Sequence, residues 1–260
     1  MIDFDNVTRS YGNKVAVDQL CLTVESGQLF ALLGPNGAGK TTTIKMLVGL
    51  LHPDSGTIVV GGHDVIRRTR LATRQIGYIP DQPFLYDKLT GREFLEFSGE
   101  MRGFDRKTIG DRIARESENF QLHEFLDDLT ETYSHGMKQR LVFASALMHD
   151  PKVLVIDEPM VGLDPRSVRL VKDLLRSLSA AGTIVFMSTH TLSVAEEIAD
   201  RIGIVNNGRL HFLGTVGELQ QELASPHKTL EPLFLELTGD AGGRQMVAPL
   251  SHHTSRANQP

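Results

Sequence analysis

Residues 34–41 read Gly-Pro-Asn-Gly-Ala-Gly-Lys-Thr and match the pattern G-x-x-x-x-G-K-[ST] of a nucleotide phosphate loop. An apolar run at residues 29–33 precedes the loop and is typical of a buried strand, and residues 42–49 are typical of a following helix. The loop is rich in glycine because backbone N–H groups can turn inward around an anion only where no side chain obstructs them. This segment therefore predicts a strand, loop and helix of an α/β fold.

The chemistry of the loop predicts its ligand. Lys40 can reach the β- and γ-phosphates as a compact cation, and Thr41 can offer its hydroxyl to Mg²⁺. We expect a nucleoside triphosphate with magnesium, and the alternative is a glycine-rich turn that matches the pattern by chance. The residues expected to contact nucleotide in this segment are Gly34, Pro35, Asn36, Gly37, Ala38, Gly39, Lys40, Thr41 and Thr42.

Composition limits the classes of protein that fit. The 260 residues are 40% hydrophobic and 23% charged, which suits one sizeable globular domain or two small ones. A formal net charge of −5 gives no general basic field, so nucleic acid is not the expected main partner. The single cysteine, Cys21, is expected to be a small core residue. No apolar stretch is long enough for a membrane span and no basic leader begins the chain, so we expect a cytoplasmic protein.

The order of strand and helix signals predicts the domain organisation. Residues 1–83 and 150–225 are expected to form a discontinuous nucleotide-binding core with a β subdomain, because short strand-like runs and turns dominate there. Lys14 to Val17 and Leu20 to Val24 are two such runs, and Asn206-Asn207-Gly208 is a hairpin signal. Residues 84–149 carry helix signals, including a capping box at Thr90 and Glu93 and N-caps at Asp105 and Ser134. Residues 226–260 form an extension that we expect to be disordered from about residue 239.

Two carboxylates follow a second buried strand, Val153 to Ile156. The carboxyl ends of strands in open α/β sheets are where such folds bind ligands. Asp157 is therefore expected to hold Mg²⁺, directly or through water, and Glu158 to accept a proton from an attacking water. A simple strand cap is the alternative for the pair.

A second anion site is predicted where Ser134 begins a helix. Its hydroxyl can cap that helix, and the small Gly136 leaves the helix N-terminus open to a terminal phosphate. Capping alone also explains Ser134. Because the phosphate loop already surrounds the phosphates of one nucleotide, a second phosphate site makes most sense if it serves a neighbouring subunit.

With these motifs in this order, the chain resembles the ATP-binding subunits of ABC transporters over residues 1 to about 224. The resemblance implies a P-loop NTPase (RecA-like) core with an N-terminal antiparallel β subdomain and an inserted helical subdomain. It also implies that GPNGAGKT is Walker A, that YSHGMKQR from Tyr133 is the signature motif and that VLVIDEP ending at Pro159 is Walker B. Gly162-Leu163-Asp164 matches the D-loop, His190 the switch histidine that contacts the γ-phosphate, and Tyr11 the aromatic that stacks on adenine.

Some of these positions have a second interpretation or depart from the family pattern. His190 could only cap a helix, and Tyr11 could be an ordinary surface residue. Asp81 stands where the family usually has a glutamine near Mg²⁺, so a carboxylate replaces an amide there or the register shifts by one. The signature has His135 where glycine is commoner and Met137 where glutamine is commoner, which leaves Ser134 and Gly136 as its expected phosphate contacts.

The family resemblance also implies a mechanism and partners. Two cassettes, identical or different, would pair head to tail on ATP and drive a separate membrane permease from the cytoplasmic face of the cell membrane. The permease would dock near residues 81–86, although Phe84, Leu85 and Tyr86 could equally pack locally. Leu230 to Thr238 looks like the ending of cassettes that serve export-type permeases.

The sequence leaves two alternatives from other classes of protein. One is a soluble cassette ATPase that acts on nucleic acid or ribosomes, although the second cassette or long coiled-coil insertion usual there is absent from this sequence. The other is a GTPase or small-molecule kinase, although the guanine-reading pattern Asn-Lys-x-Asp is absent.

Overall fold

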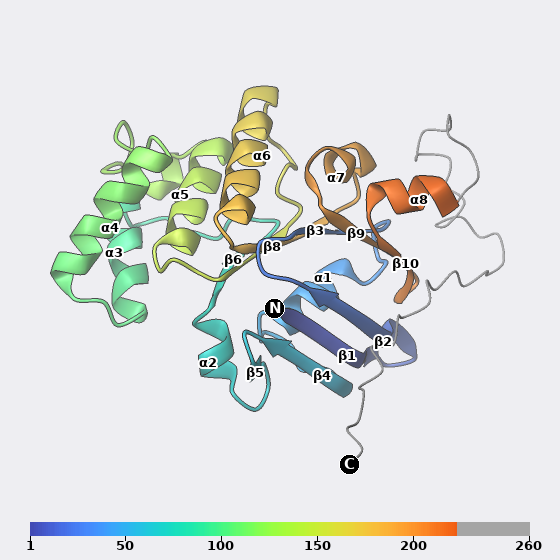
Figure 1. The fold of residues 1–260 in the computed structure, drawn as a ribbon. Helices are drawn as coiled ribbons and strands as arrows, with labels where there is room; N and C mark the ends of the chain where they lie inside the picture. Colours follow the sequence, from blue (N-terminus) through green and yellow to red (C-terminus); the bar gives the residue numbers. More distant parts are fainter. Residues whose placement is uncertain (223–260) are drawn as a thin grey trace, which may run out of the picture.

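The computed structural model describes residues 1–222 (Figure 1). The predictions made for the C-terminal extension, including the export-like segment at Leu230 to Thr238, lie outside the described residues. Two sheets and the helices packed on them make up the described chain, and strands and helices are interspersed along the sequence from β3 onward. The α/β class expected from the phosphate loop is thereby confirmed.

The first sheet is antiparallel and lies beside the phosphate loop. Its four strands are arranged in the order β2-β1-β4-β5. The strands are β1 (Ile2–Tyr11), β2 (Lys14–Val24), β4 (Ser55–Val60) and β5 (His63–Asp64). The two separate runs expected before Val24 form one strand, because β2 pairs with β1 along its whole length through three irregularities of register. This sheet is the expected N-terminal β subdomain.

The second sheet is mostly parallel and carries the phosphate loop at the end of its central strand. Its order is β10-β9-β3-β8-β7-β6. The strands are β3 (Leu29–Leu33), β6 (Ile76–Ile79), β7 (Val153–Asp157), β8 (Ile184–Thr189), β9 (Arg201–Asn206) and β10 (Arg209–Gly214). β3 lies between β8 and β9 and pairs in parallel with both, so the ends of β3, β7 and β8 open at one edge of the sheet. The expected Asn206-Asn207-Gly208 hairpin joins β9 to β10.

Alternation along the central strands divides the interior into two cores. In β3, Leu29, Ala31 and Leu33 belong to one core, while Phe30 and Leu32 belong to the other. The second core is shared with the antiparallel sheet and with α1, which lies between the two sheets (Figure 1). α1 (Lys40–Leu47) and the short helix α2 (Thr69–Thr73) pack on this second core. α6 (Pro165–Ala180), α7 (Leu192–Ile198) and α8 (Val216–Glu222) pack on the first core, at the opposite face of the parallel sheet.

The segment between β6 and β7 is helical, as the sequence predicted. It forms α3 (Gly91–Met101), α4 (Arg106–Asn119), the single turn η1 (Thr130–Thr132) and α5 (His135–Leu147). The three helices gather at one end of the sheet (Figure 1). Each begins at an expected cap: Thr90 and Glu93 form a complete capping box, Asp105 accepts from Thr108 N–H, and Ser134 accepts from Met137 N–H.

Three local predictions need correction. Cys21 is exposed rather than a core residue, because Leu20, Leu22 and Val24 occupy the inward face of β2 and Cys21 falls on the other face. The helix after the phosphate loop begins at Lys40, two residues earlier than expected. The short helix α2 was not expected at all, and nothing in its five residues resembles an amphipathic pattern long enough to predict it.

No helix within residues 1–222 is long and apolar enough to cross a bilayer.

We predict that Thr90→Ala lowers the free energy of unfolding by about 1 kcal/mol, because it removes a helix N-cap. The Thr90 hydroxyl accepts from the Glu93 N–H at 3.2 Å and the Glu93 carboxylate accepts from the Thr90 N–H at 2.8 Å, so the variant loses one side of a reciprocal cap. Denaturant unfolding of the nucleotide-free protein measures the change. Glu96→Ala, an exposed position on the same helix, serves as the control and should stay within about 0.5 kcal/mol of the parent.

Candidate functional site

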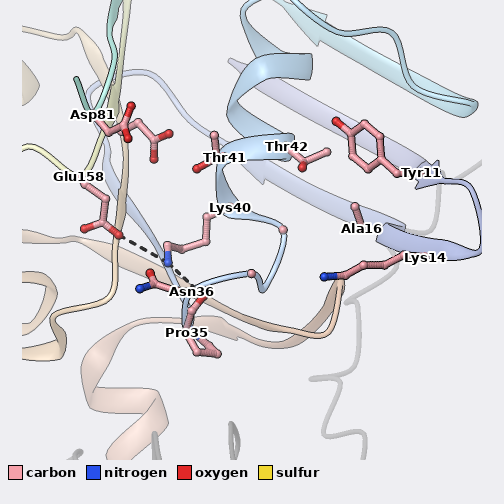
Figure 2. Close-up of a pocket in the computed structure, with 13 residues that line it drawn as sticks. Tyr11, Lys14, Ala16, Pro35, Asn36, Lys40, Thr41, Thr42, Asp81 and Glu158 are labelled. Atoms are coloured by element: carbon pink, nitrogen blue, oxygen red, sulfur yellow. Dashed lines mark hydrogen bonds and ion pairs between the residues drawn. The ribbon is translucent and has the colours of Figure 1, made fainter. Parts of the chain in front are cut away.

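A cavity of about 320 Å³ lies against the phosphate loop at the carboxyl ends of the central strands (Figure 2). It is bounded on one side by the loop and α1, on a second side by the end of β7 and the loop after β6, and on the third by the hairpin of β1 and β2. Its lining consists of Tyr11, Lys14, Ala16, Pro35, Asn36, Gly37, Gly39, Lys40, Thr41, Thr42, Asp81, Asp157 and Glu158.

The loop takes its shape from two glycines that no other residue could replace without strain. Gly39 has φ of 109° and a Cβ added there would lie 2.3 Å from the Ala16 carbonyl oxygen. A Cβ on Gly34 would lie 2.3 Å from the Val205 carbonyl oxygen. The loop is therefore pressed against β2 on one side and β9 on the other, and its backbone N–H groups have the concave arrangement that suits an anion.

Lys40 is the buried cation of the site, with only 6% of its surface exposed. Its Nζ donates to the Gly34 carbonyl oxygen at 2.7 Å and to the Pro35 carbonyl oxygen at 3.2 Å. It also lies 3.5 Å from Glu158 Oε1, an ion pair drawn in Figure 2. The loop thus holds the ammonium group in place at the cavity, where a phosphate oxygen could replace the carboxylate as its partner.

Glu158 lies between the two other side chains predicted to be catalytic, Lys40 and His190. Its Oε1 faces Lys40, while its Oε2 lies 3.0 Å from His190 Nδ1. The backbone of Glu158 has φ of 52°, an uncommon left-handed conformation for a residue with a side chain, and its N–H donates to the Ser188 hydroxyl at 3.1 Å. His190 follows β8 and is about half exposed; it does not line the cavity itself but contacts it through Glu158.

Asp157 is a buried carboxylate without a positive partner in the described residues. Burial raises its pKa, and the Asp81 and Glu158 carboxylates raise it further, whereas hydrogen bonds from the Ser188 and Thr41 hydroxyls lower it. The Ser188 hydroxyl donates to Asp157 Oδ1. Burial, followed by the charges of Asp157 and Asp81, raises the pKa of Tyr78 to about 12.

The donor groups at this end of the cavity fit Mg²⁺. Carboxylate and hydroxyl oxygens are its preferred ligands, and a cation would neutralise the buried charge of Asp157 beside Asp81. Residues 1–222 contain no group of three or more His, Cys, Asp and Glu side chains that could hold a metal ion by themselves. That arrangement agrees with Mg²⁺ held by one or two carboxylates together with substrate phosphates rather than by a protein cage.

The opposite side of the cavity contains residues that the sequence did not identify. Lys14 and Ala16 lie at the start of β2 and line the cavity beside Tyr11. Tyr11 is about half exposed, and the Arg9 guanidinium lies 5.2 Å from its ring centroid. A single lysine after a tight turn matches no sequence motif. The position of Lys14 at the cavity could therefore be predicted only from the pairing of β1 with β2.

Four of the residues expected to contact nucleotide do not line the cavity. Gly34 and Ala38 support the loop from beneath: the Gly34 carbonyl holds Lys40, and the Ala38 carbonyl accepts from Gly208 N–H at 3.0 Å. Ser134 and Gly136 lie at the start of α5, away from the residues that form the cavity. The phosphate loop and the start of α5 are therefore two separate sites within one chain.

The start of α5 packs against the segment that follows Glu158. Gln139 is buried and its Nε2 donates to the Pro159 carbonyl oxygen at 2.8 Å. The His135 ring lies over Gly162, where an added Cβ would come 3.2 Å from His135 Nε2. Met137 and Met160 are partly buried against the same core. The unusual residues of this motif thus have a local role: they hold the segment at Gly162 against α5.

Comparison with known proteins gives one consistent result. The family model described as ABC transporter matches residues 17–161. The chain is 39% identical over 223 residues to the linearmycin resistance ATP-binding protein LnrL of Bacillus subtilis, covering 86% of this chain and 72% of that protein. It is 42% identical over 208 residues to the Nod factor export ATP-binding protein I of Burkholderia lata, covering 80% and 68%. A solved structure of an ATP-binding subunit of an ABC transporter has a TM-score of 0.84 at 30% identity, covering 91% of this chain and 99% of that one.

We predict that Asp157→Asn makes the nucleotide-free protein more stable at neutral pH. Because the folded state raises the pKa of this carboxyl above its ordinary value of 3.8, ionisation removes stability as the pH rises through the interval between those two values. The advantage of the variant should therefore be absent below about pH 3.8 and complete above the raised pKa.

Thermal unfolding across that pH range measures the effect, with Asp111→Asn on exposed α4 as a control of equal charge change. If the Asp157→Asn variant is less stable than the parent at every pH, the inference that the buried charge of Asp157 destabilises the folded protein is wrong.

Proposed function

The chain belongs to the ABC transporter family, and we propose that it hydrolyses ATP and closes as a dimer around it to drive a separate membrane permease, in the direction of export. Its relatives are ATP-binding subunits of transporters. Hydrolysis, the dimer, the permease and the direction of transport are proposals for this chain, and each has its own support.

The observation that supports the dimer best is the separation of the two phosphate sites. Lys40, Thr41, Asp157 and Glu158 surround one cavity, while Ser134 lies elsewhere at an open helix N-terminus. A helix N-terminus with a capping hydroxyl suits an anion. Two copies arranged head to tail would bring Ser134 and Gly136 of each onto the terminal phosphate held by the loop of the other.

The residues of the cavity have distinct roles in hydrolysis. Lys40 moves from Glu158 to the β- and γ-phosphates and stabilises their charge, which frees the Glu158 carboxylate to orient a water and accept its proton. His190 holds the other oxygen of Glu158 and lies where it can contact the γ-phosphate. Thr41 and Asp157 would hold Mg²⁺, with Asp81 beside them, and the ion supplies charge stabilisation to the phosphates.

Tyr11 is proposed to stack on the adenine. Its ring lines the cavity on the far side from Glu158, across Thr42 (Figure 2). The Arg9 guanidinium, which lies against the Tyr11 ring, is itself paired with Asp54 at 2.6 Å, so this cation–π contact helps to fix the orientation of the ring. Lys14, on the same side, is suited to the nucleotide's outer phosphate or ribose oxygens.

The permease is proposed to dock on an exposed aromatic ridge formed by Phe84, Tyr86 and Phe97. The sequence left local packing and docking open for the segment after Asp81. Leu85 is buried in the core, which agrees with local packing, while Phe84 is 73% and Tyr86 is 47% exposed, which supports docking for these two rings. The Tyr86 ring contacts the other two edge to face, with centroids 5.6 Å from the Phe84 ring and 5.6 Å from the Phe97 ring. An apolar patch of this kind beside a nucleotide loop is typical of an interaction surface. Docking there would hold the protein at the cytoplasmic face of the membrane.

Export is favoured by the relatives, one named for linearmycin resistance and another for Nod factor export. The alternative, a cassette ATPase that acts on nucleic acid or ribosomes, has less support. The net charge of −5 offers no general attraction to a polyanion, and neither of these two relatives is named for an action on nucleic acid.

We predict that Lys40→Ala weakens ATP binding by about 10- to 100-fold or more, because it removes a charge-assisted contact to phosphate. Isothermal titration with ATP and Mg²⁺ measures the affinity. Lys45→Ala removes an exposed lysine from the same helix and should leave the affinity unchanged. Equal losses in both variants would mean that charge in general, and not the loop lysine, attracts the nucleotide.

We predict that Glu158→Gln keeps ATP affinity but slows turnover by about 10²- to 10⁴-fold, the usual effect of losing a general base. Because ATP then persists, the variant should accumulate as a dimer in ATP, which mass measurement in solution detects. Glu196→Gln on the exposed face of α7 is the control. Unchanged turnover in Glu158→Gln would remove the assigned role of this carboxylate.

A further inference from the structure

Glu158 has a backbone conformation that its sequence context opposes. Its φ is 52°, in the left-handed region that residues with a side chain seldom adopt. Pro159 follows it, and a residue before proline favours an extended backbone with negative φ. In this conformation the carboxylate lies 3.5 Å from Lys40 and 3.0 Å from His190. Contacts from other parts of the fold must therefore hold the backbone of Glu158 in place.

The backbone on both sides of Glu158 is anchored by side chains. The Glu158 N–H donates to the Ser188 hydroxyl at 3.1 Å. On the other side, the Pro159 carbonyl oxygen accepts from Nε2 of Gln139, on α5, at 2.8 Å. Because the proline ring fixes its own φ, holding the Pro159 carbonyl also restricts the rotation of Glu158. The bonds from Ser188 and Gln139 therefore tie this turn to β8 and to α5.

A second contact from α5 holds the same segment three residues further on. The imidazole of His135 lies over Gly162, where an added Cβ would be 3.2 Å from His135 Nε2. His135 and Gln139 are four residues apart and so lie on one face of α5. That face therefore contacts the segment after Glu158 at both Pro159 and Gly162.

Gln139 contains a polar atom that stability alone does not explain. Its side chain is 7% exposed, and its Oε1 has no hydrogen-bond partner among the described residues. A buried carbonyl oxygen without a partner is destabilising. A methionine has nearly the same length and would fill the space without that oxygen. The Nε2 donor, which bonds to Pro159, is therefore what a glutamine adds at this position.

The proposed reaction makes this anchor more important. When Lys40 turns to the phosphates, the Glu158 carboxylate loses the cation that it faces in the nucleotide-free protein. Its other partner is His190, whose side chain is about half exposed. The direction of the carboxylate then depends mainly on the Glu158 backbone. A displacement of about 1 Å near a reacting group can slow a reaction by about 10²-fold.

We propose that Gln139 is a positioning residue for hydrolysis. Through its bond to the Pro159 carbonyl it holds Glu158 in the left-handed conformation, and His135 supports the same segment at Gly162. This inference rests on the proposed role of Glu158 and adds the residue that keeps its carboxylate in place. Gln139 does not line the nucleotide cavity, so its effect on turnover passes through Glu158.

The first test is a double-mutant cycle in ATP turnover. Gln139→Met keeps the size of the side chain and removes the donor. We expect it to slow turnover by about 10- to 100-fold, while ATP affinity stays within about twofold because the phosphate loop is unchanged. In the Glu158→Gln background the same change should slow turnover no further, because the carboxylate that it positions is already absent. Single-turnover assays with radiolabelled ATP resolve the slow rates, and titration calorimetry measures the affinity.

Two further variants control this cycle. Gln221→Met makes the same chemical change at an exposed position of α8 and should leave turnover unchanged. Because Gln139 is buried, thermal unfolding checks that its variant folds. His135→Ala changes an exposed residue and removes the other contact of α5 with the segment. It should slow turnover less than Gln139→Met does, and it should have no effect in the Glu158→Gln background.

The second test is structural. A crystal structure of the Gln139→Met variant should show a negative φ at Glu158 and a carboxylate displaced from His190. If φ stays near 52° and the 3.0 Å contact with His190 is kept, the bond to Pro159 does not hold this conformation and the proposal is wrong.

The outcomes of the cycle separate this inference from the proposed function. If Glu158→Gln hydrolyses ATP as fast as the parent, the proposed role of Glu158 fails and the positioning role fails with it. If Glu158→Gln is slow but Gln139→Met is as fast as the parent, only the positioning role is wrong. The same holds if Gln139→Met slows both backgrounds by an equal factor, because its effect then does not pass through Glu158.

Discussion

The close approach of the phosphate loop to two backbones is the constraint on which the rest of the site depends. The carbonyl oxygens of Ala16 and Val205 occupy the space where side chains on Gly39 and Gly34 would project. The loop is therefore fixed between the antiparallel sheet and the parallel sheet, and the hairpin after β9 is tied to it by the hydrogen bond from Gly208 N–H to the Ala38 carbonyl. This arrangement orients Lys40 before any ligand is present and brings Tyr11 and Lys14 to the same cavity.

The arrangement of charges in the cavity lowers the stability of the nucleotide-free protein. Asp157 is buried beside two other carboxylates, and its raised pKa records that the folded state disfavours its ionised form. Glu158 is held in a left-handed backbone conformation, which a residue with a side chain adopts only when its surroundings impose it. Both features make sense if a cation and a phosphate chain complete the site, because those charges turn the unfavourable cluster into a set of ligands. Strain and destabilisation of this kind are common at sites that bind or react.

The sequence predicted those features that depend on local backbone chemistry. The phosphate loop, the two buried strands that end at it, the capping box at Thr90 and the hairpin at Asn207 follow from spacing and residue type, and each is present. Alternation along a strand divides its residues between two faces but does not say which face meets the core. The sequence therefore could not predict which face of β2 is buried, and the prediction that Cys21 is a core residue was wrong. Lys14 reaches the cavity only because β1 and β2 pair, and His135 meets Gly162 only because α5 packs on the segment after β7. Both contacts join residues that are far apart in sequence or bear no motif.

β6 gives the two halves of the proposed mechanism a physical connection. At its first residue, the Ile76 carbonyl accepts a hydrogen bond from His149, which lies just after α5, and just beyond its last residue Asp81 lines the nucleotide cavity. At about 3.3 Å per residue, this four-residue strand spans the distance between the two with no flexible segment inside it. The strand pairs with β7 through Tyr78 and Val155, so it cannot shift without moving the strand that ends at Asp157 and Glu158. A partner docked on the aromatic ridge would therefore act on the sheet edge that carries Asp157 and Glu158, and the loop from Asp81 to Tyr86 is the shortest route by which either end could bias the other.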